Sequence, residues 1–277
     1  MANINFDERF LPIELSDPTL EYGHIRNLTF HSEALRGRGD VSLFIPPKCL
    51  SLTDVPLVVL LHGVYGSHWA WFMKGAAHLT AERLIANGRI RPMILAAPSD
   101  GLNGDGTGYL PYAHADYEHW IVNDVVDCVQ KLFPCTAPAQ SIFLAGLSMG
   151  GYGALRLGAK FPERFRAISA HSSITHISQF DQFVRHSMHV ESMPPEESDI
   201  LHWIRRNSHR LPALRFDCGR NDNLFEANKT LHRELESIGV AHQFASYDGE
   251  HNWDYWKAHL EDSLLFFADS LRGIATR

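Results

Sequence analysis

The segment G-L-S-M-G, residues 146–150, has the residue types of a nucleophile elbow, a tight turn between a strand and a helix. An apolar run precedes it and the small residues G-Y-G-A follow it, which is the context that this turn needs. Gly146 and Gly150 carry no side chain that could clash across the turn. The turn aims the serine hydroxyl over a helix N-terminus, which favours developing negative charge. The pattern therefore predicts Ser148 as a nucleophile.

A serine hydroxyl needs a general base, and the base needs an acid that fixes its tautomer. Asp222 and His251 follow Ser148 in that order. Asp222 lies just past the carboxyl end of a predicted strand, where catalytic loops gather in open α/β sheets. His251 lies in a turn between the last predicted strand and the C-terminal helix. We expect Asp222 to be the acid and His251 the base.

Three other residues compete for these two roles. Asp217 is the alternative acid, but it lies inside a predicted strand and before a glycine turn, so we expect its side chain to belong to the sheet. His171, beside the fourth buried strand, and His62, in an early turn, are alternative bases. Neither histidine follows both the serine and the acid. We expect Asp217→Asn to affect mainly stability and Asp222→Asn to lower turnover.

Acyl transfer also needs two hydrogen-bond donors that face the oxyanion of the tetrahedral intermediate. The backbone N–H of Met149, the residue after the nucleophile, is the first expected donor. The second is expected in the turn H-G-V-Y-G, residues 62–66, and Val64 is our choice. The alternative is that this turn only reverses the chain. Its two glycines at the end of a strand allow the backbone to approach a ligand, which favours the donor role.

The elements that position these residues are predicted from hydrophobic patterns. Residues 22–31 and 40–45 alternate around the turn L-R-G-R-G-D and indicate an antiparallel hairpin. Continuous apolar runs are typical of strands buried on both faces. Such runs or later strand patterns occupy residues 56–63, 92–98, 141–147, 167–172, 213–219 and 242–249. Helical patterns occupy residues 76–87, 117–132, 150–160, 226–238 and 253–271.

Alternation of strands and helices predicts an α/β fold with a mainly parallel sheet. Because the sequence contains no internal repeat and no linker rich in glycine or proline, we expect residues 1–277 to form a single domain. Residues 174–212 interrupt the alternation with prolines, acidic residues and aromatics, and they are interpreted as a cap-like excursion over a pocket.

Composition restricts the class of protein. The chain has 277 residues, of which 45% are apolar and 21% charged, and its formal net charge is −7. Its basic residues are scattered, which argues against nucleic acid as a partner. No apolar run is long enough for a membrane span, and the first residues do not form a secretory signal, so we expect a cytoplasmic protein without a membrane partner. Self-association into a homo-oligomer stays open.

Cysteine and histidine patterns indicate no metal site. The four cysteines have no C-x-x-C spacing. Among 17 histidines there is no H-E-x-x-H motif, and the pair His186 and His189 has no carboxylate at ligand spacing. We expect neither a metal nor another cofactor.

Four segments carry a family resemblance: L-L-H-G-V-Y-G, A-G-L-S-M-G-G-Y-G-A-L, C-G-R-N-D-N-L-F and G-E-H-N-W-D-Y-W. With the opening segment S-E-A-L-R-G-R-G-D-V-S-L-F-I-P-P, the chain resembles the esterase D-like branch of the α/β hydrolases over nearly its whole length. This branch includes tributyrin-type carboxylesterases, feruloyl and acetyl xylan esterases, S-formylglutathione hydrolases and mycolyltransferases. The segments S-M-G-G-Y-G-A-L and H-N-W-x-Y-W are most similar to the tributyrin- and feruloyl-type esterases. Tyr152 stands where S-formylglutathione hydrolases usually have histidine.

The resemblance implies the α/β-hydrolase fold, with a mainly parallel central sheet, an antiparallel N-terminal hairpin and helices on both faces. It implies Ser148 as nucleophile, Asp222 and His251 as acid and base, and Val64 and Met149 as oxyanion donors. The expected activity is that of a serine carboxylesterase that cleaves small esters of short acyl, aryl or carbohydrate groups through an acyl-enzyme. A thioesterase of the S-formylglutathione hydrolase type, an acyltransferase and a non-catalytic ligand-binding relative are the alternatives.

Substrate-binding residues follow less directly, because loops that vary build the pockets of a fold. Aromatic side chains near the predicted turns are the candidates for contact with substrate. They are Tyr65, Trp69, Trp71, Tyr109, Tyr112, Trp120 and Trp253.

Overall fold

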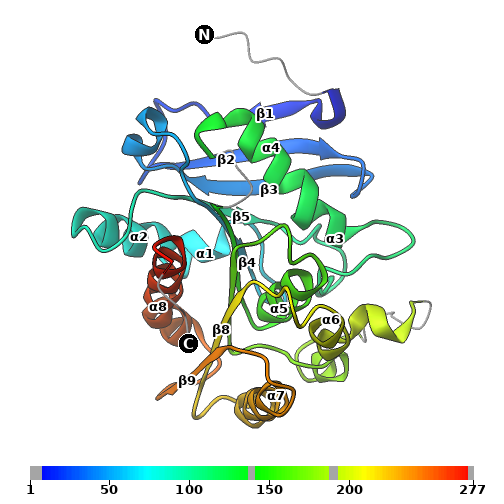
Figure 1. Cartoon of the computed structure of the whole chain (residues 1–277). Coiled ribbons are helices and arrows are strands. Elements are labelled where there is room, and N and C mark those ends of the chain that lie inside the picture. Colours follow the sequence, from blue (N-terminus) through cyan, green and yellow to red (C-terminus); the bar gives the residue numbers. More distant parts are fainter. Residues whose placement is uncertain (1–7, 137–140, 187–192, 274–277) are drawn as a thin grey trace.

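A nine-stranded sheet forms the centre of the molecule, in the strand order β1-β2-β3-β5-β4-β6-β7-β8-β9 (Figure 1). The computed structural model describes residues 8–136, 141–186 and 193–273. The strands are β1 (Ile13–Leu15), β2 (Ile25–Ser32), β3 (Gly37–Phe44), β4 (Leu57–Leu61), β5 (Ile94–Pro98), β6 (Ile142–Leu147), β7 (Ala167–His171), β8 (Ala213–Gly219) and β9 (Gln243–Tyr247).

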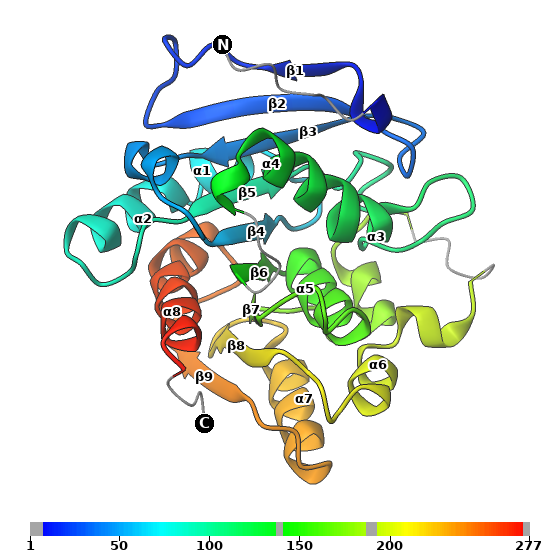
Figure 2. The same ribbon diagram turned by 45° about the horizontal axis from the view of Figure 1, so that its top comes forward.

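The helices cover both faces of this sheet. They are α1 (Ala70–Met73), α2 (Ala77–Ala86), α3 (Tyr117–His119), the π-helix η3 (Trp120–Val125), α4 (Val126–Leu132), α5 (Met149–Lys160), α6 (Ile200–Arg206), α7 (Phe225–Ser237) and α8 (Trp253–Leu271). Short 3-10 helices are η1 (Glu8–Phe10), η2 (Pro47–Ser51), η4 (Pro134–Thr136), η6 (Ile177–Gln182) and η7 (Pro195–Ser198). Helices α1, α2 and α8 lie on one face and α3 to α7 on the other (Figure 2).

The central strands are apolar throughout because both of their faces are buried. In β4, Val59 packs into the hydrophobic core on the α5 side and Val58 into the core on the α8 side. Successive side chains of a strand point to opposite faces, so a run of five apolar residues serves both cores. The predicted mainly parallel sheet is confirmed, since every pairing from β5 through β4 to β9 is parallel.

The predicted N-terminal hairpin is confirmed, but its glycines do not form the turn. Strands β2 and β3 pair antiparallel, and the turn occupies residues 33–36. Gly37 and Gly39 lie in β3 instead. A Cβ atom at Gly39 would lie 2.5 Å from the indole of Trp120, so this glycine leaves room for a buried tryptophan. Glycine here serves side-chain packing rather than chain reversal.

The predicted helices are all present, and the structure adds elements without a clear sequence period. Residues 117–132 are helical throughout, with a π-helix in the middle. Strand β1 and helices α1 and α6 were not predicted; they have three, four and seven residues, too few for a period to stand out. The excursion 174–212 contains η6, η7 and α6, and its residues 187–192 lie outside the described part.

The carboxyl ends of the parallel strands meet at one edge of the sheet and so define where a site can form. The turn at residues 62–66 follows β4, Ser148 follows β6, Asp222 lies three residues after β8, and His251 lies four residues after β9. Strand β4 has β5, the next strand in the sequence, on one side and β6 on the other, so the strand order reverses direction at β4. In open α/β sheets, ligands bind where the strand order reverses in this way.

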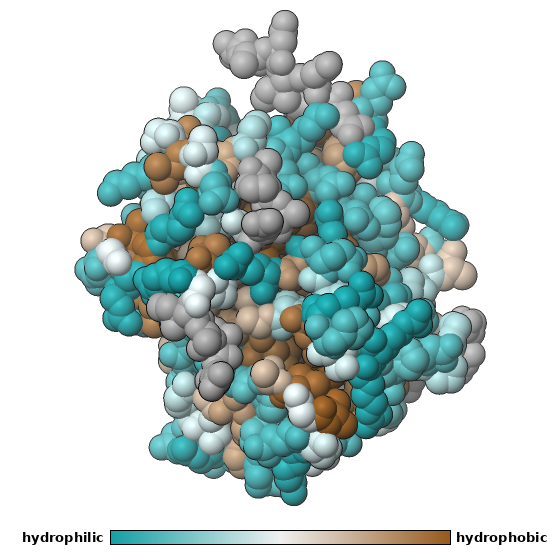
Figure 3. Space-filling model, viewed as in Figure 1, coloured by the Kyte–Doolittle hydropathy of each residue, from teal (hydrophilic) through white to brown (hydrophobic). Residues whose placement is uncertain are grey.

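The described helices include none that is long and apolar enough to cross a membrane. On the face seen in Figure 3, hydrophilic residues dominate and apolar residues form smaller groups between them.

Candidate active site

The turn at Ser148 has the strained backbone that the sequence predicts. Ser148 has φ 53° and ψ −116°, an unusual conformation for a residue with a side chain. A Cβ atom on Gly146 would lie 2.0 Å from the carbonyl oxygen of Gly150, and one on Gly150 would lie 2.2 Å from that of Leu61. Only glycine fits at both positions, so these two residues allow the chain to turn sharply from β6 into α5.

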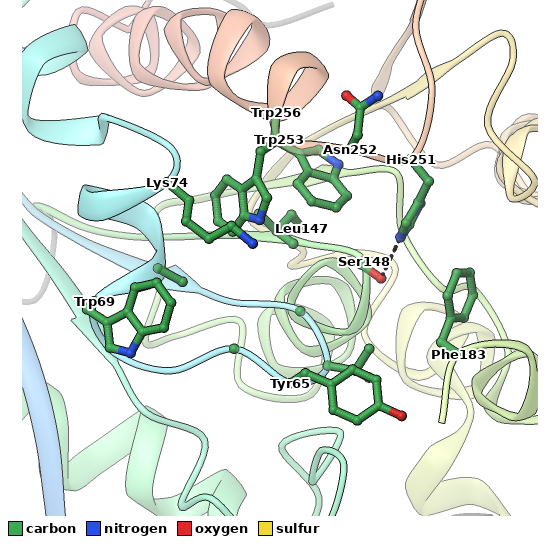
Figure 4. A pocket seen from close by; sticks show the side chains of 14 residues that line it. Tyr65, Trp69, Lys74, Leu147, Ser148, Phe183, His251, Asn252, Trp253 and Trp256 are labelled. Carbon is green, nitrogen blue, oxygen red and sulfur yellow. Dashed lines mark hydrogen bonds between the residues drawn. The ribbon is translucent and has the colours of Figure 1, made fainter. Parts of the chain in front are cut away.

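Three side chains from separate loops are joined by hydrogen bonds at this turn. The Nε2 atom of His251 lies 3.0 Å from the Ser148 hydroxyl (Figure 4). Its Nδ1 atom lies 2.9 Å and 3.1 Å from the two carboxylate oxygens of Asp222. With Nδ1–H donating to this carboxylate, Nε2 is left as the acceptor that a general base needs. The structure thus brings together the three residues that the sequence selects, in a geometry suited to nucleophilic catalysis.

The carboxyl of Asp222 is kept ionised beneath His251. Burial by itself raises its pKa, but hydrogen bonding and charge attraction from His251 and the amide of Leu224 outweigh burial. The pKa of Asp222 therefore lies below its ordinary value. The Leu224 amide donates to Asp222 over 2.8 Å and helps to fix the carboxylate. An ionised carboxylate at this position stabilises the imidazolium that forms when His251 accepts a proton.

The two expected oxyanion donors lie on either side of the serine. Met149 is the first residue of α5, where amides have no acceptor within the helix. Val64 lines the same pocket as Ser148, and its amide has no backbone acceptor among the described residues. Both amides are therefore available to a developing negative charge, and the oxyanion role of Val64 and Met149 stays a prediction.

His62 has a structural position in the turn after β4. Its ring donates from Nδ1 to the Gly63 carbonyl over 2.7 Å and accepts at Nε2 from the Asp100 amide over 3.1 Å. A Cβ atom on Gly66 would lie 2.6 Å from Nδ1 of this ring. The turn is therefore shaped around a buried histidine, whose two nitrogens are both occupied.

The serine opens into a pocket of about 400 Å³ (Figure 4). Its wall is mainly aromatic, and the ring of Phe183 stacks on His251 with centroids 4.9 Å apart. The pocket is lined by Gly63, Val64, Tyr65, Gly66, Trp69, Ala70, Lys74, Leu147, Ser148, Phe183, His251, Asn252, Trp253 and Trp256. An apolar pocket with a few polar groups at one point is typical of a site for a small organic molecule.

The predicted substrate contacts are only partly present in this pocket. Tyr65, Trp69 and Trp253 line it, but four other predicted residues do not. Tyr112 is half-buried outside the pocket, and its ring centroid lies 5.4 Å from that of His114 and 5.9 Å from that of Tyr117.

Trp71, Tyr109 and Trp120 are fully buried in the core, which contradicts the expectation that they contact substrate. Their polar atoms donate to the backbone carbonyls of Leu61, His62 and Ser99 respectively. These three rings hold the ends of strands in place, since a buried indole or phenol needs a hydrogen-bond partner.

The lining residues that sequence reasoning missed include Lys74, Phe183 and Trp256. Lys74 follows the four-residue helix α1, Phe183 follows the short helix η6, and Trp256 lies in the first turn of α8. Phe183 belongs to the excursion 174–212, which therefore does contribute to the pocket wall. The motif around His251 contained Trp256 and was the one signal that pointed to it.

The competing residues Asp217 and His171 form a separate set below the site. The His171 ring bridges the Asp217 carboxylate and the Ser263 hydroxyl, which lies 2.8 Å from Nε2. We call Ser263, His171 and Asp217 the buried set, since all three are fully buried. Neither His171 nor Asp217 reaches the pocket, in agreement with the expectation that Asp217 belongs to the sheet.

Among the described residues, no group of three or more histidine, cysteine, aspartate or glutamate side chains is arranged to hold a metal ion.

Comparisons with known proteins identify the family of this chain. A family model described as putative esterase matches residues 32–267. The chain is 23% identical over 266 residues to an acetyl esterase of Caldicellulosiruptor saccharolyticus, which covers 86% of this chain and 96% of that protein. It is 38% identical over 184 residues to an S-formylglutathione hydrolase of Paracoccus denitrificans, covering 62% of this chain and 65% of that protein.

Solved structures extend the same comparison to the fold. A ferulic acid esterase superposes with a TM-score of 0.77 at 24% identity, over 93% of this chain and 99% of the other. An S-formylglutathione hydrolase of Staphylococcus aureus superposes with a TM-score of 0.76 at 19% identity, over 92% and 99%. The α/β-hydrolase fold expected from the resemblance is confirmed. The chain belongs to the putative esterase family and is a serine hydrolase that acts on carboxylic ester bonds.

Proposed function

We propose that this protein cleaves small carboxylic esters with Ser148 as nucleophile, His251 as general base and Asp222 as the acid that orients it. The observation that carries the proposal is the strained serine, hydrogen-bonded to His251 and facing the aromatic pocket. No other serine of the described chain combines these three features.

The geometry supports a two-step reaction. The Ser148 oxygen bonds to the ester carbonyl carbon as its proton passes to Nε2 of His251. Negative charge on the carbonyl oxygen is stabilised by the amides of Val64 and Met149. When the intermediate collapses, the bond to the alcohol oxygen breaks and His251 gives that oxygen its proton. Water then attacks the acyl-enzyme with His251 again as base, which releases the acid and restores Ser148.

The dimensions of the pocket favour small acyl groups. A volume of about 400 Å³ is near the lower end of the range for small-molecule sites. Tyr65, Trp69 and Trp253 give it flat apolar walls. We therefore propose short or compact acyl chains as the preferred substrates.

A p-nitrophenyl ester series from acetate to laurate tests this proposal, with intact-protein mass measured for an acyl adduct. We expect turnover to be greatest for short chains and to fall by about 10⁴-fold or more in Ser148→Ala. Ser263→Ala is the matched control, since Ser263 also contacts a histidine but lies outside the pocket. Equal activity of wild type and Ser148→Ala, or an adduct on another residue, would contradict the proposal.

A thioesterase activity is the second candidate, favoured by the 38% identity to an S-formylglutathione hydrolase. Here Tyr152 is fully buried and its hydroxyl donates to the Ser198 carbonyl over 2.7 Å, so it does not reach the pocket. S-formylglutathione added to the ester series compares the two activities directly. A kcat/KM for this thioester far above that for p-nitrophenyl acetate would make the protein a thioesterase.

We propose a reducing compartment such as the cytoplasm as the place of action. None of the four cysteines, Cys49, Cys128, Cys135 and Cys218, forms a disulfide bond, which is usual where glutathione keeps thiols reduced. Cell fractionation with an antibody to the protein tests this.

A further inference from the structure

The pocket contains one lysine side chain and no carboxylate. Of the 14 lining residues, none is acidic, and Lys74 is the one lysine or arginine. This contrasts with the chain as a whole, whose formal net charge is −7. A lysine in an otherwise aromatic pocket is a recognition element for a negatively charged ligand group.

The backbone of Lys74 is held by its local structure, and its side chain is exposed. Its amide donates to the Ala70 carbonyl over 2.9 Å, and Ala70 and Lys74 face the pocket from the same side of helix α1. The next residue, Gly75, allows Trp253 to pack closely, because a Cβ atom there would lie 2.9 Å from the indole. The short helix is thus built against Trp253.

The ammonium group is held over an aromatic ring but not neutralised. Nζ of Lys74 lies 5.4 Å from the centroid of the Trp253 ring, a cation–π contact. Within the described ranges no carboxylate forms an ion pair with it, whereas Lys160 contacts both Glu118 and Glu197. The Lys74 side chain is therefore open to a carboxylate of a ligand.

The direction of catalysis shows which part of a substrate Lys74 would meet. His251 must give a proton to the leaving oxygen, so the alcohol part of the ester lies on the His251 side. The acyl part then extends away from His251. In Figure 4, Lys74 and Trp69 lie on the other side of Ser148 from His251 and Phe183. The acyl chain is thus directed toward Lys74.

We propose that Lys74 selects acyl groups that end in a carboxylate, so that half-esters of dicarboxylic acids are preferred substrates. This inference rests on the proposed esterase function and specifies the substrate class of the same site. The aromatic side chains of the pocket would contact the methylene groups of such a chain, and the Lys74 ammonium would pair with its terminal carboxylate. A neutral acyl chain of the same length would occupy the same space but leave the ammonium without a partner.

The test compares two substrates with the same acyl chain and leaving group, one ending in a carboxylate and one in a neutral ester: p-nitrophenyl hydrogen adipate and its methyl ester. The measured quantity is the ratio of their kcat/KM values, after subtraction of the uncatalysed rates. In wild type we expect the charged ester to be preferred, and in Lys74→Met we expect this ratio to fall about fivefold, the effect of an ion pair partly screened by solvent. Lys74→Glu should lower it further.

Lys257→Met is the matched control, because it removes the same charge from an exposed residue outside this pocket. Added salt provides a measurement that needs no variant, since screening should lower the ratio in wild type and leave it unchanged in Lys74→Met. Equal ratios in Lys74→Met and Lys257→Met would overturn the inference while neutral-ester hydrolysis still supported the esterase. Absence of Ser148-dependent hydrolysis of both esters would instead overturn the proposed function.

Discussion

Two sets of serine, histidine and aspartate lie in this molecule with nearly the same hydrogen bonds. In the first, His251 is 3.0 Å from Ser148 and 2.9 Å from the nearer oxygen of Asp222. In the buried set, His171 is 2.8 Å from Ser263 and 2.9 Å from the nearer oxygen of Asp217. Distances between these three residue types therefore do not distinguish a reactive serine from a structural one.

The two sets differ in the surroundings of their serines, Ser148 and Ser263. Ser148 has a strained backbone at the start of a helix and opens into a pocket, whereas Ser263 lies in the middle of α8 and is fully buried. Interior helix amides are bonded within the helix, so none near Ser263 is free for an oxyanion. To act as a nucleophile, a serine therefore needs access to substrate and free backbone amides in addition to these hydrogen bonds.

The buried set has a different role, which is to join secondary structure elements below the active site. Asp217 on β8 contacts His171 on β7, accepts from the Tyr255 hydroxyl on α8 over 2.9 Å, and pairs with Arg215 at 2.5 Å. Burial opposes ionisation, but the charges of His171 and Arg215 outweigh it, so the pKa of Asp217 lies well below its usual range. This network stabilises the end of the sheet that carries the catalytic loops.

Exchanging each aspartate for asparagine gives the largest contrast between the two sets. Asp222→Asn should lower kcat by about 10⁴-fold with little loss of stability, because the wrong histidine tautomer then faces Ser148. Asp217→Asn should retain kcat in the folded fraction but lower the free energy of unfolding by about 3 kcal/mol, since buried Arg215 loses the nearer of its two carboxylate partners and keeps only the more exposed Asp262. Steady-state kinetics and urea unfolding of both variants measure these effects.

The reverse pattern would show that the roles of the two sets have been exchanged. If folded Asp217→Asn lost turnover and Asp222→Asn kept it, Asp217 would be the catalytic acid. Circular dichroism at the assay temperature establishes the folded fraction in each case.

The pH dependence of stability gives a smaller contrast. A carboxyl whose pKa is lowered on folding stabilises the native state fully above its unfolded pKa, near 4, and this contribution is lost as pH falls through the folded pKa. The stability difference between wild type and Asp217→Asn should thus be constant from about pH 7 to pH 5 and should decrease below about pH 4.

Urea unfolding at several pH values measures this difference. Asp248→Asn is the control, because the Asp248 side chain is 91% exposed, and its difference from wild type should stay near zero throughout. A difference between wild type and Asp217→Asn that grows as the pH falls would contradict an ionised, stabilising Asp217.

The sequence predicts the first set because each of its members lies in a local motif at the end of a strand. Ser148, Asp222 and His251 are each specified by a few neighbouring residues, and the strand order then brings them to one edge. The buried set has no such signal. Ser263 and His171 are 92 residues apart, and Ser263 lies in an ordinary amphipathic helix.

The pocket is the part that the sequence predicts least. Aromatic residue type does not say whether a ring faces substrate or core, so Trp71 and Trp69 were treated alike although one is buried and the other is 43% exposed. Their two-residue separation in and beside the short helix α1 gives them different directions. A four-residue helix has no period from which these directions follow.

Removing the tyrosine hydroxyl that donates to the buried set gives the smallest expected effect. Tyr255→Phe loses the hydrogen bond to Asp217 but keeps the ring, which packs against Gly249 close to His251. We expect the free energy of unfolding to fall by about 1–2 kcal/mol, the usual value of a hydrogen bond to a charged group, and kcat to change by less than about threefold. Tyr22→Phe, at a residue 85% exposed, is the control. If instead Tyr255→Phe lowered kcat more than about tenfold at unchanged stability, the buried set would position His251, and the separation between a catalytic and a structural set would fail.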